Sequence, residues 1–176
     1  MWHSPYKLFL YPDDPNYVCN SHQLTSLLEK LEFIDYEISD KRYAIGENFL
    51  SLLTFMGCSP NIELEPQNDK PYCYIEISTA KEASFIAGKN TKNALCENCK
   101  EPLSDPVKSK MICPNCNQSI DTTKLNWRKS AFIASCWICV GNIYELEAIP
   151  NDQLLLALEN ETGVKWKPAY IRQESL

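Results

Sequence analysis

Glycine and histidine are both scarce in this chain, which has five glycines and two histidines among 176 residues. So few glycines make it hard to build the loops that surround nucleotide phosphates, and neither G-x-x-x-x-G-K-S/T nor G-x-G-x-x-G occurs. His3 and His22 are the only imidazoles, so a Ser/His/acid or Cys/His catalytic system has few bases to draw on. These shortages disfavour an enzyme.

A long hydrophobic run is also missing. The best candidate, residues 131–144, is shorter than the about 20 residues of a spanning helix and contains Ser, Cys, Gly and Asn. The apolar run near the N-terminus is too short for a secretory signal, and Pro12 and Pro15 follow it directly. Hydrophobic residues make up 44% and charged residues 23% of the chain, as in ordinary globular domains. We therefore expect a cytoplasmic protein that does not associate with membranes.

Cysteine, in contrast, is abundant, and four of the nine cysteines form two closely spaced pairs. Cys96-x-x-Cys99 and Cys113-x-x-Cys116 are turns that can each bring two sulfurs to one ion, and the segment between them can fold as a hairpin. The stretches LCENCK and ICPNCN resemble the two knuckles of a zinc ribbon. This resemblance implies one structural Zn²⁺, since four thiolates complete a tetrahedral site and leave no position for a catalytic water.

Two disulfides, or an iron or redox site, are the alternatives for these four cysteines. Disulfides need an oxidising compartment, and an odd total of nine cysteines does not fit a complete disulfide framework. Zinc in a reducing cytoplasm is therefore the expectation.

The net charge of −6 is unevenly distributed. Residues 81–129 contain nine Lys or Arg and five Asp or Glu, whereas residues 1–80 contain five and twelve. Such a basic segment is either a solvated surface or a contact for a polyanion. The candidate contact residues are Lys108, Lys110, Trp127 and Arg128. Aromatic stacking and phosphate neutralisation by these side chains would bind nucleic acid; alternatively, Trp127 packs the ribbon onto its neighbour.

The hydrophobic pattern predicts an α+β fold, in which a mixed β-sheet packs with about three helices. Helices are expected over residues 21–31, capped by Ser21, over residues 47–56, and from a cap at Asn151 or Asp152 to Gly163. The expected strands are residues 7–11, 33–38, 43–45, 62–64, 72–77, 143–149 and 165–171.

The zinc ribbon is expected to be an insert within one core. Residues 1–88 and 130–176 would form the α+β core, and residues 89–129 the insert, because neither flank alone supplies a complete set of strands and helices. The layout, with the turn Gly-Cys-Ser-Pro at 57–60 and a late ribbon, resembles that of small bacterial proteins. That resemblance implies no particular activity.

Cys136-Trp-Ile-Cys139 is a third C-x-x-C motif, with three interpretations. It is a pair of buried core thiols, a second metal site, or a redox dithiol of the kind found where a strand meets a helix N-terminus. On a strand, cysteines three apart point to opposite faces. Cys19-x-x-His22 has the spacing of a half metal site but lacks an evident second half.

These observations favour a non-enzymatic, zinc-binding scaffold or adaptor that contacts another protein. The alternatives are a nucleic-acid-binding protein that uses the basic ribbon insert, and a thiol oxidoreductase that uses Cys136 and Cys139.

Overall fold

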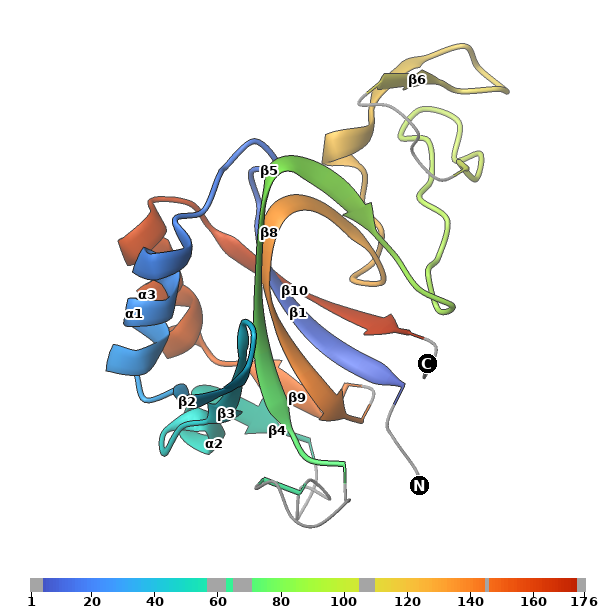
Figure 1. Cartoon of the computed structure of the whole chain (residues 1–176). Coiled ribbons are helices and arrows are strands. Elements are labelled where there is room, and N and C mark those ends of the chain that lie inside the picture. The colour runs from blue at the N-terminus through green and yellow to red at the C-terminus, as the bar shows by residue number, and fades with distance from the viewer. Residues whose placement is uncertain (1–4, 57–62, 65–70, 105–109, 145, 174–176) are drawn as a thin grey trace.

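The computed structural model describes residues 5–56, 63–64, 71–104, 110–144 and 146–173 (Figure 1). A six-stranded sheet forms its centre, and every pair of neighbouring strands is antiparallel. The strands in sheet order are β10 (Trp166–Arg172), β1 (Tyr6–Pro12), β8 (Phe132–Ile143), β5 (Tyr74–Ile86), β3 (Arg42–Ile45) and β2 (Ile34–Ser39). The expected α+β fold with three helices is confirmed, and its sheet is antiparallel rather than mixed.

Helices α1 (Ser21–Lys30) and α3 (Asp152–Thr162) cover one face of this sheet (Figure 1). Alternate residues of each strand point to this face, and with the buried leucines of the helices they form the largest apolar cluster. Its fully buried members include Leu8, Leu28 and Ile138. The hydrophobic periodicity in the sequence therefore corresponds to the core.

An asparagine caps the N-terminus of each long helix. The side chains of Asn20 and Asn151 each accept a hydrogen bond from a backbone N–H in the first helical turn. Gly163 ends α3 in the left-handed conformation, with φ of +74°. The expected boundaries of α3 are confirmed, whereas α1 is capped by Asn20 and not by Ser21.

Residues 47–56 do not form the single helix that we expected. Helix α2 comprises only Phe49–Leu52, and the chain continues directly as β4 (Leu53–Phe55), which pairs with β9 (Ala148–Pro150). An apolar run of this kind fits a buried helix or a buried strand equally well, and here the distant partner β9 decides.

Two other expected strands need correction. The strand at 143–149 is divided, since β8 ends at Ile143 and β9 begins at Ala148. Leu146 lies between them with φ of +56°, a conformation that breaks an extended chain. Of the expected strand at 62–64, residue 62 lies outside the described residues, as does the turn at 57–60, and residues 63 and 64 are not in a strand.

Strand β5 is longer than expected, and β8 was not among the expected strands except for its last residue, Ile143; both strands bend over the sheet (Figure 1). Their register shifts between Thr79 and Ser84, as happens at a β-bulge, which increases the local twist. The bend carries Phe132 onto Tyr11, with stacked rings 4.3 Å apart, and encloses a second apolar cluster on the sheet face opposite the helices. It also carries the end of β5 toward the cysteine-rich segment.

The outer edge of β10 is covered by the two ends of that segment. The side chain of Asn90 accepts from the N–H of Arg172 and donates to the carbonyl of Tyr170, so it substitutes for the peptide group of a neighbouring strand. The N–H of Tyr170 donates to the carbonyl of Lys129 at 2.7 Å. Pro168 has no N–H to offer at this edge. These contacts close a strand edge that would otherwise pair with other chains.

Candidate metal centre

The four cysteines Cys96, Cys99, Cys113 and Cys116 lie in two turns with the same backbone hydrogen-bond pattern. In the first, the N–H of Cys96 donates to the carbonyl of Glu101 and the N–H of Lys100 donates to the carbonyl of Cys96, both at 2.9 Å. Equivalent bonds of 2.9 and 3.0 Å close the second turn around Cys113. The residue after each pair has a left-handed backbone, with φ of +62° at Lys100 and +56° at Asn117.

Short extended segments hold the two turns against each other. An isolated bridge between Leu95 and Pro102 closes the first turn, and the hairpin of β6 (Lys110–Ile112) and β7 (Ser119–Asp121) carries the second. Leu103 and Ile120 form a small apolar cluster with the cysteines. The hairpin of β6 and β7 encloses the second cysteine pair, so it is not the hairpin expected between the two pairs, where residues 105–109 lie outside the described residues.

The sulfur atoms are arranged as a tetrahedral metal requires. The Sγ atoms of Cys96 and Cys116 lie 3.7 Å apart, those of Cys99 and Cys113 lie 3.5 Å apart, and all four lie within 4.8 Å of one another. Zinc–sulfur bonds of about 2.3 Å in a tetrahedron give sulfur–sulfur distances of about 3.8 Å. The four-sulfur donor set and its spacing thus fit a zinc ion.

Hydrogen-bond donors surround the sulfurs of the second turn. Backbone N–H groups of Asn115 and Cys116 reach the Cys113 sulfur, and that of Gln118 reaches the Cys116 sulfur. The Asn98 side chain is the largest contribution that lowers the pKa of the Cys116 thiol, to about 6. These donors favour the thiolate of Cys116, which is the form that binds metal. At Cys113 the backbone donors are outweighed by burial and by the hydrogen bonds with Cys99 and Cys116, which raise the pKa of its thiol to about 11.

Trp127 attaches the cysteine-rich segment, residues 89–129, to the sheet. Its side chain is only 4% exposed and lies against Phe85, with ring centroids 4.8 Å apart, in a cluster with Ala94 and Ala131. The expectation that Trp127 belongs to a contact surface is wrong, because a buried indole cannot stack on a base. Of the other candidate contact residues, Lys110 and Arg128 are exposed, and Lys108 lies outside the described residues.

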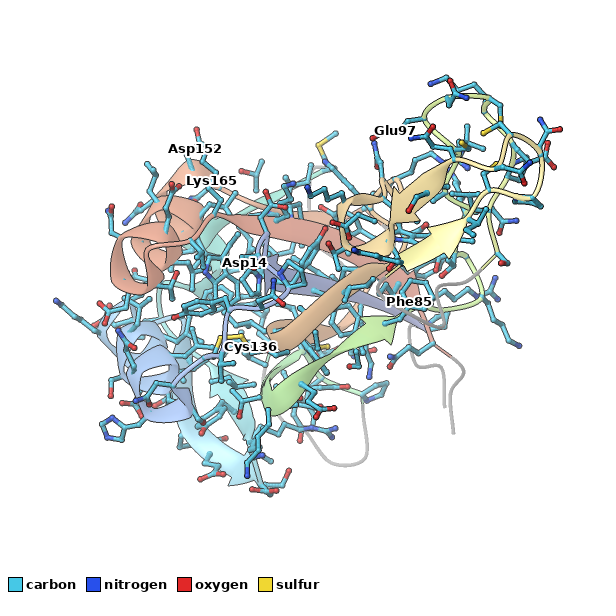
Figure 2. The ribbon with its side chains drawn as sticks, turned by 90° about the horizontal axis from the view of Figure 1, so that it is seen from above. Asp14, Phe85, Glu97, Cys136, Asp152 and Lys165 are labelled. Carbon is cyan, nitrogen blue, oxygen red and sulfur yellow. A yellow bond between two sulfur atoms is a disulfide. The ribbon has the colours of Figure 1, made fainter. Side chains whose placement is uncertain are left out.

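Cys136 and Cys139 do not form a dithiol. Cys136 is joined by a disulfide to Cys19, and Figure 2 shows this bond beside the label of Cys136, between α1 and the sheet. Cys139 belongs to the apolar cluster on the other face of the sheet, and burial raises the pKa of its thiol to about 12. A redox pair or second metal site at these two residues is therefore excluded by the alternation of side chains along β8.

The half site Cys19-x-x-His22 is not completed either. Cys19 is engaged in the disulfide, and His22 is exposed in the first turn of α1. Among the described residues, the four ribbon cysteines are the only group of three or more His, Cys, Asp or Glu side chains placed to share a metal ion. The Cys19–Cys136 disulfide was not predicted, since a separation of 117 residues leaves no local signal, and it conflicts with the expected reducing cytoplasm.

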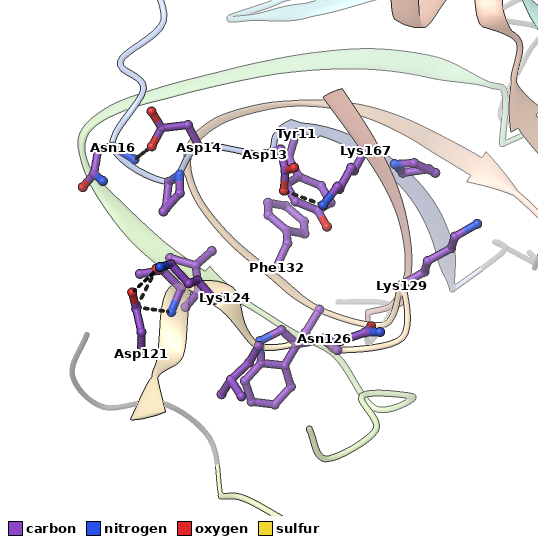
Figure 3. Close-up of a pocket in the computed structure, with 17 residues that line it drawn as sticks. Tyr11, Asp13, Asp14, Asn16, Asp121, Lys124, Asn126, Lys129, Phe132 and Lys167 are labelled. Carbon is purple, nitrogen blue, oxygen red and sulfur yellow. Dashed lines mark hydrogen bonds and ion pairs between the residues drawn. The ribbon is translucent and has the colours of Figure 1, made fainter. Parts of the chain in front are cut away.

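A groove of about 880 Å³ separates the cysteine-rich segment from the sheet (Figure 3). Its walls carry two ion pairs, in which Lys167 contacts Asp13 at 2.5 Å and Lys124 contacts Asp121 at 3.8 Å. Lys129 stands at its rim (Figure 3). The lysines of its walls, apart from Lys129, are thus neutralised from within the protein.

Comparison with protein-family models, with curated proteins and with solved structures finds no match. No helix among the described residues is long and apolar enough to cross a membrane. Function must therefore be argued from the site itself.

Proposed function

We propose that this chain is a zinc-binding scaffold or adaptor protein without catalytic activity, which contacts another protein. The observation that carries the proposal is the closed set of four sulfurs with tetrahedral spacing. Cys96, Cys99, Cys113 and Cys116 would hold one zinc ion, which would be structural because no coordination position is left for water or substrate.

The attachment of the ribbon supports this role. The segment that carries the cysteines projects beyond the end of the sheet (Figure 1), and its own apolar cluster is small. A module of this size needs a metal for a defined shape, because its core is too small to stabilise it. Asn90, Lys129 and Trp127 fix the base of the module to the sheet. Zinc would therefore give a rigid shape to a surface that another protein recognises.

The test compares the zinc-loaded chain with a variant that carries Cys113→Ser and Cys116→Ser. Affinity capture from native extract is expected to return a stoichiometric partner with the wild-type chain and to lose it with the variant. His22→Ala is the matched control, which should keep both zinc and partner. Capture of the same partner without zinc, or no partner at all, would refute the proposal. A cytoplasmic location stays a prediction, to be tested by fractionation.

A further inference from the structure

The cysteine-rich segment leads back into the sheet, at β8, through a turn formed by residues 127–130. The N–H of Ser130 donates to the carbonyl of Trp127 at 3.0 Å, and the two central residues, Arg128 and Lys129, have φ of +52° and +59°. Two successive left-handed residues with this bond define a type I′ turn. Asn-Gly is the preferred pair for such a turn, because a left-handed backbone is unfavourable for residues other than glycine and asparagine.

The turn is tightly held despite its composition. The N–H of Arg128 donates to the side chain of Asn126 at 2.8 Å, and its guanidinium donates to the carbonyl of Asn93 at 2.7 Å. The hydroxyl of Ser130 donates back to Trp127 at 2.6 Å. Strained backbone conformations that neighbouring hydrogen bonds hold in place often occur at functional positions. Arg128 and Lys129 are thus kept where Asn and Gly would be more stable.

Four exposed basic residues lie on the segments that meet at this turn, and the guanidinium of one of them, Arg172, also lies over the ring of Tyr6, 5.8 Å from its centroid. The backbone N–H of Lys92 donates to the hydroxyl of Ser130, and the guanidinium of Arg128 donates to the carbonyl of Asn93, which follows Lys92. The carbonyl of Lys129 accepts from the N–H of Tyr170, two residues before Arg172 in β10. We call the four the basic patch: Lys92, Arg128, Lys129 and Arg172.

The basic patch meets acidic side chains at the groove, where Lys129 lines the wall together with Asp13, Asp14 and Asp121. No acidic residue occurs in the segments 88–93, 126–131 and 168–173 that build it. No ion pair joins the four side chains to a carboxylate among the described residues. In the groove, Asp121 and Asp13 are paired with Lys124 and Lys167. On a protein of net charge −6, this is a site prepared for an anionic partner.

We infer that the basic patch binds an extended acidic segment of a partner protein, an inference that rests on the proposed adaptor function. Charge complementarity defines the occupant. A single-stranded nucleic acid would need free aromatic rings to stack on, whereas Trp127 and Phe132 beside the patch are 4% and 1% exposed. The half-buried ring of Tyr6 is already covered by the guanidinium of Arg172. Carboxylates need only the charges and donors that the patch presents.

The test uses the zinc-loaded full chain and a fluorescein-labelled oligoglutamate peptide, with binding followed by anisotropy. Wild-type affinity is expected to fall as salt is raised. The double variant Arg128→Asn with Lys129→Gly should bind about fivefold or more weakly, as loss of two exposed ion pairs implies. Its melting temperature should not fall, because the gain from a pair that suits a type I′ turn offsets the loss of the exposed hydrogen bond from Arg128 to Asn93. Reduced binding by this variant therefore cannot be attributed to unfolding.

The matched control removes two positive charges outside the patch, by Lys30→Gln with Lys41→Gly. Lys41 also has a left-handed backbone, with φ of +60°, so glycine suits that position too. This control should bind the peptide as the wild type does. Equal affinity of all three proteins, or no salt dependence, would overturn the inference. The inference would also be overturned if an oligonucleotide of the same charge bound more tightly than the peptide through Arg128 and Lys129. Self-association of the wild type that the patch variant abolishes would overturn it as well.

The failure of this inference is distinguishable from that of the adaptor function. If the patch variant keeps the zinc-dependent partner, the partner uses another surface and only the patch assignment fails. If no partner depends on zinc, the adaptor function fails whatever the peptide does.

Discussion

At the scale of single residues, Lys100 and Asn117 occupy equivalent positions after the two cysteine pairs. Both have left-handed backbones, which asparagine tolerates better than lysine. Lys100→Gly should therefore raise the free energy of unfolding of the zinc-loaded protein by about 0.5–1 kcal/mol, whereas Asn117→Gly should change it less. Denaturant titration of the two variants measures this difference. A larger gain at Asn117 would contradict the assignment of strain to Lys100.

Tyr11 is a residue whose ionisation is coupled to folding. Burial raises the pKa of Tyr11 from 10.0 to about 12, and the negative charge of Asp13 contributes to this increase. The folded chain therefore keeps this proton between pH 10 and 12 while the unfolded chain releases it, so stability falls as pH rises through this range. Relative to Tyr11→Phe, the wild type should lose about 1 to 2 kcal/mol across it, as seen by urea unfolding at each pH. Parallel pH profiles for the two proteins would show that Tyr11 is solvated.

At the scale of secondary-structure elements, the disulfide joins the start of α1 to β8. Cys19 and Cys136 are 117 residues apart, and a cross-link over so long a loop restricts the unfolded chain strongly. The double variant Cys19→Ala with Cys136→Ala should lose about 2–4 kcal/mol of unfolding free energy, while Cys139→Ala keeps the bond. Wild-type stability that does not change when a phosphine reductant is added would contradict a disulfide in the native protein.

The elements also show which structural features a sequence encodes locally. The turns around Cys96 and Cys113 and the end of α3 at Gly163 were predictable, because each depends on residues a few positions apart. The pairing of β4 with β9 and the bend of β5 and β8 depend on distant partners, so the local pattern misassigned residues 47–56 and shortened β5. The turn at Arg128 and Lys129 could not be predicted for a different reason, because neither arginine nor lysine is a residue typical of turns.

At the scale of the whole molecule, a disulfide-linked α+β core carries a four-cysteine segment at the edge of its sheet. The two ends of this segment close the open edge of β10 through Asn90 and Lys129, and Trp127 is buried at the junction. The basic patch lies at the same junction. The cysteine-rich segment and the basic patch are therefore attached to the sheet at the same place.

Native mass spectrometry combined with mild alkylation tests the central claim most directly. The account predicts one zinc ion per chain, with Cys96, Cys99, Cys113 and Cys116 protected until a chelator is added. The Cys113→Ser and Cys116→Ser variant should lose the ion, and His22→Ala should keep it. A chain that carries no metal, with these four thiols labelled at once or oxidised to two disulfides, would contradict the account.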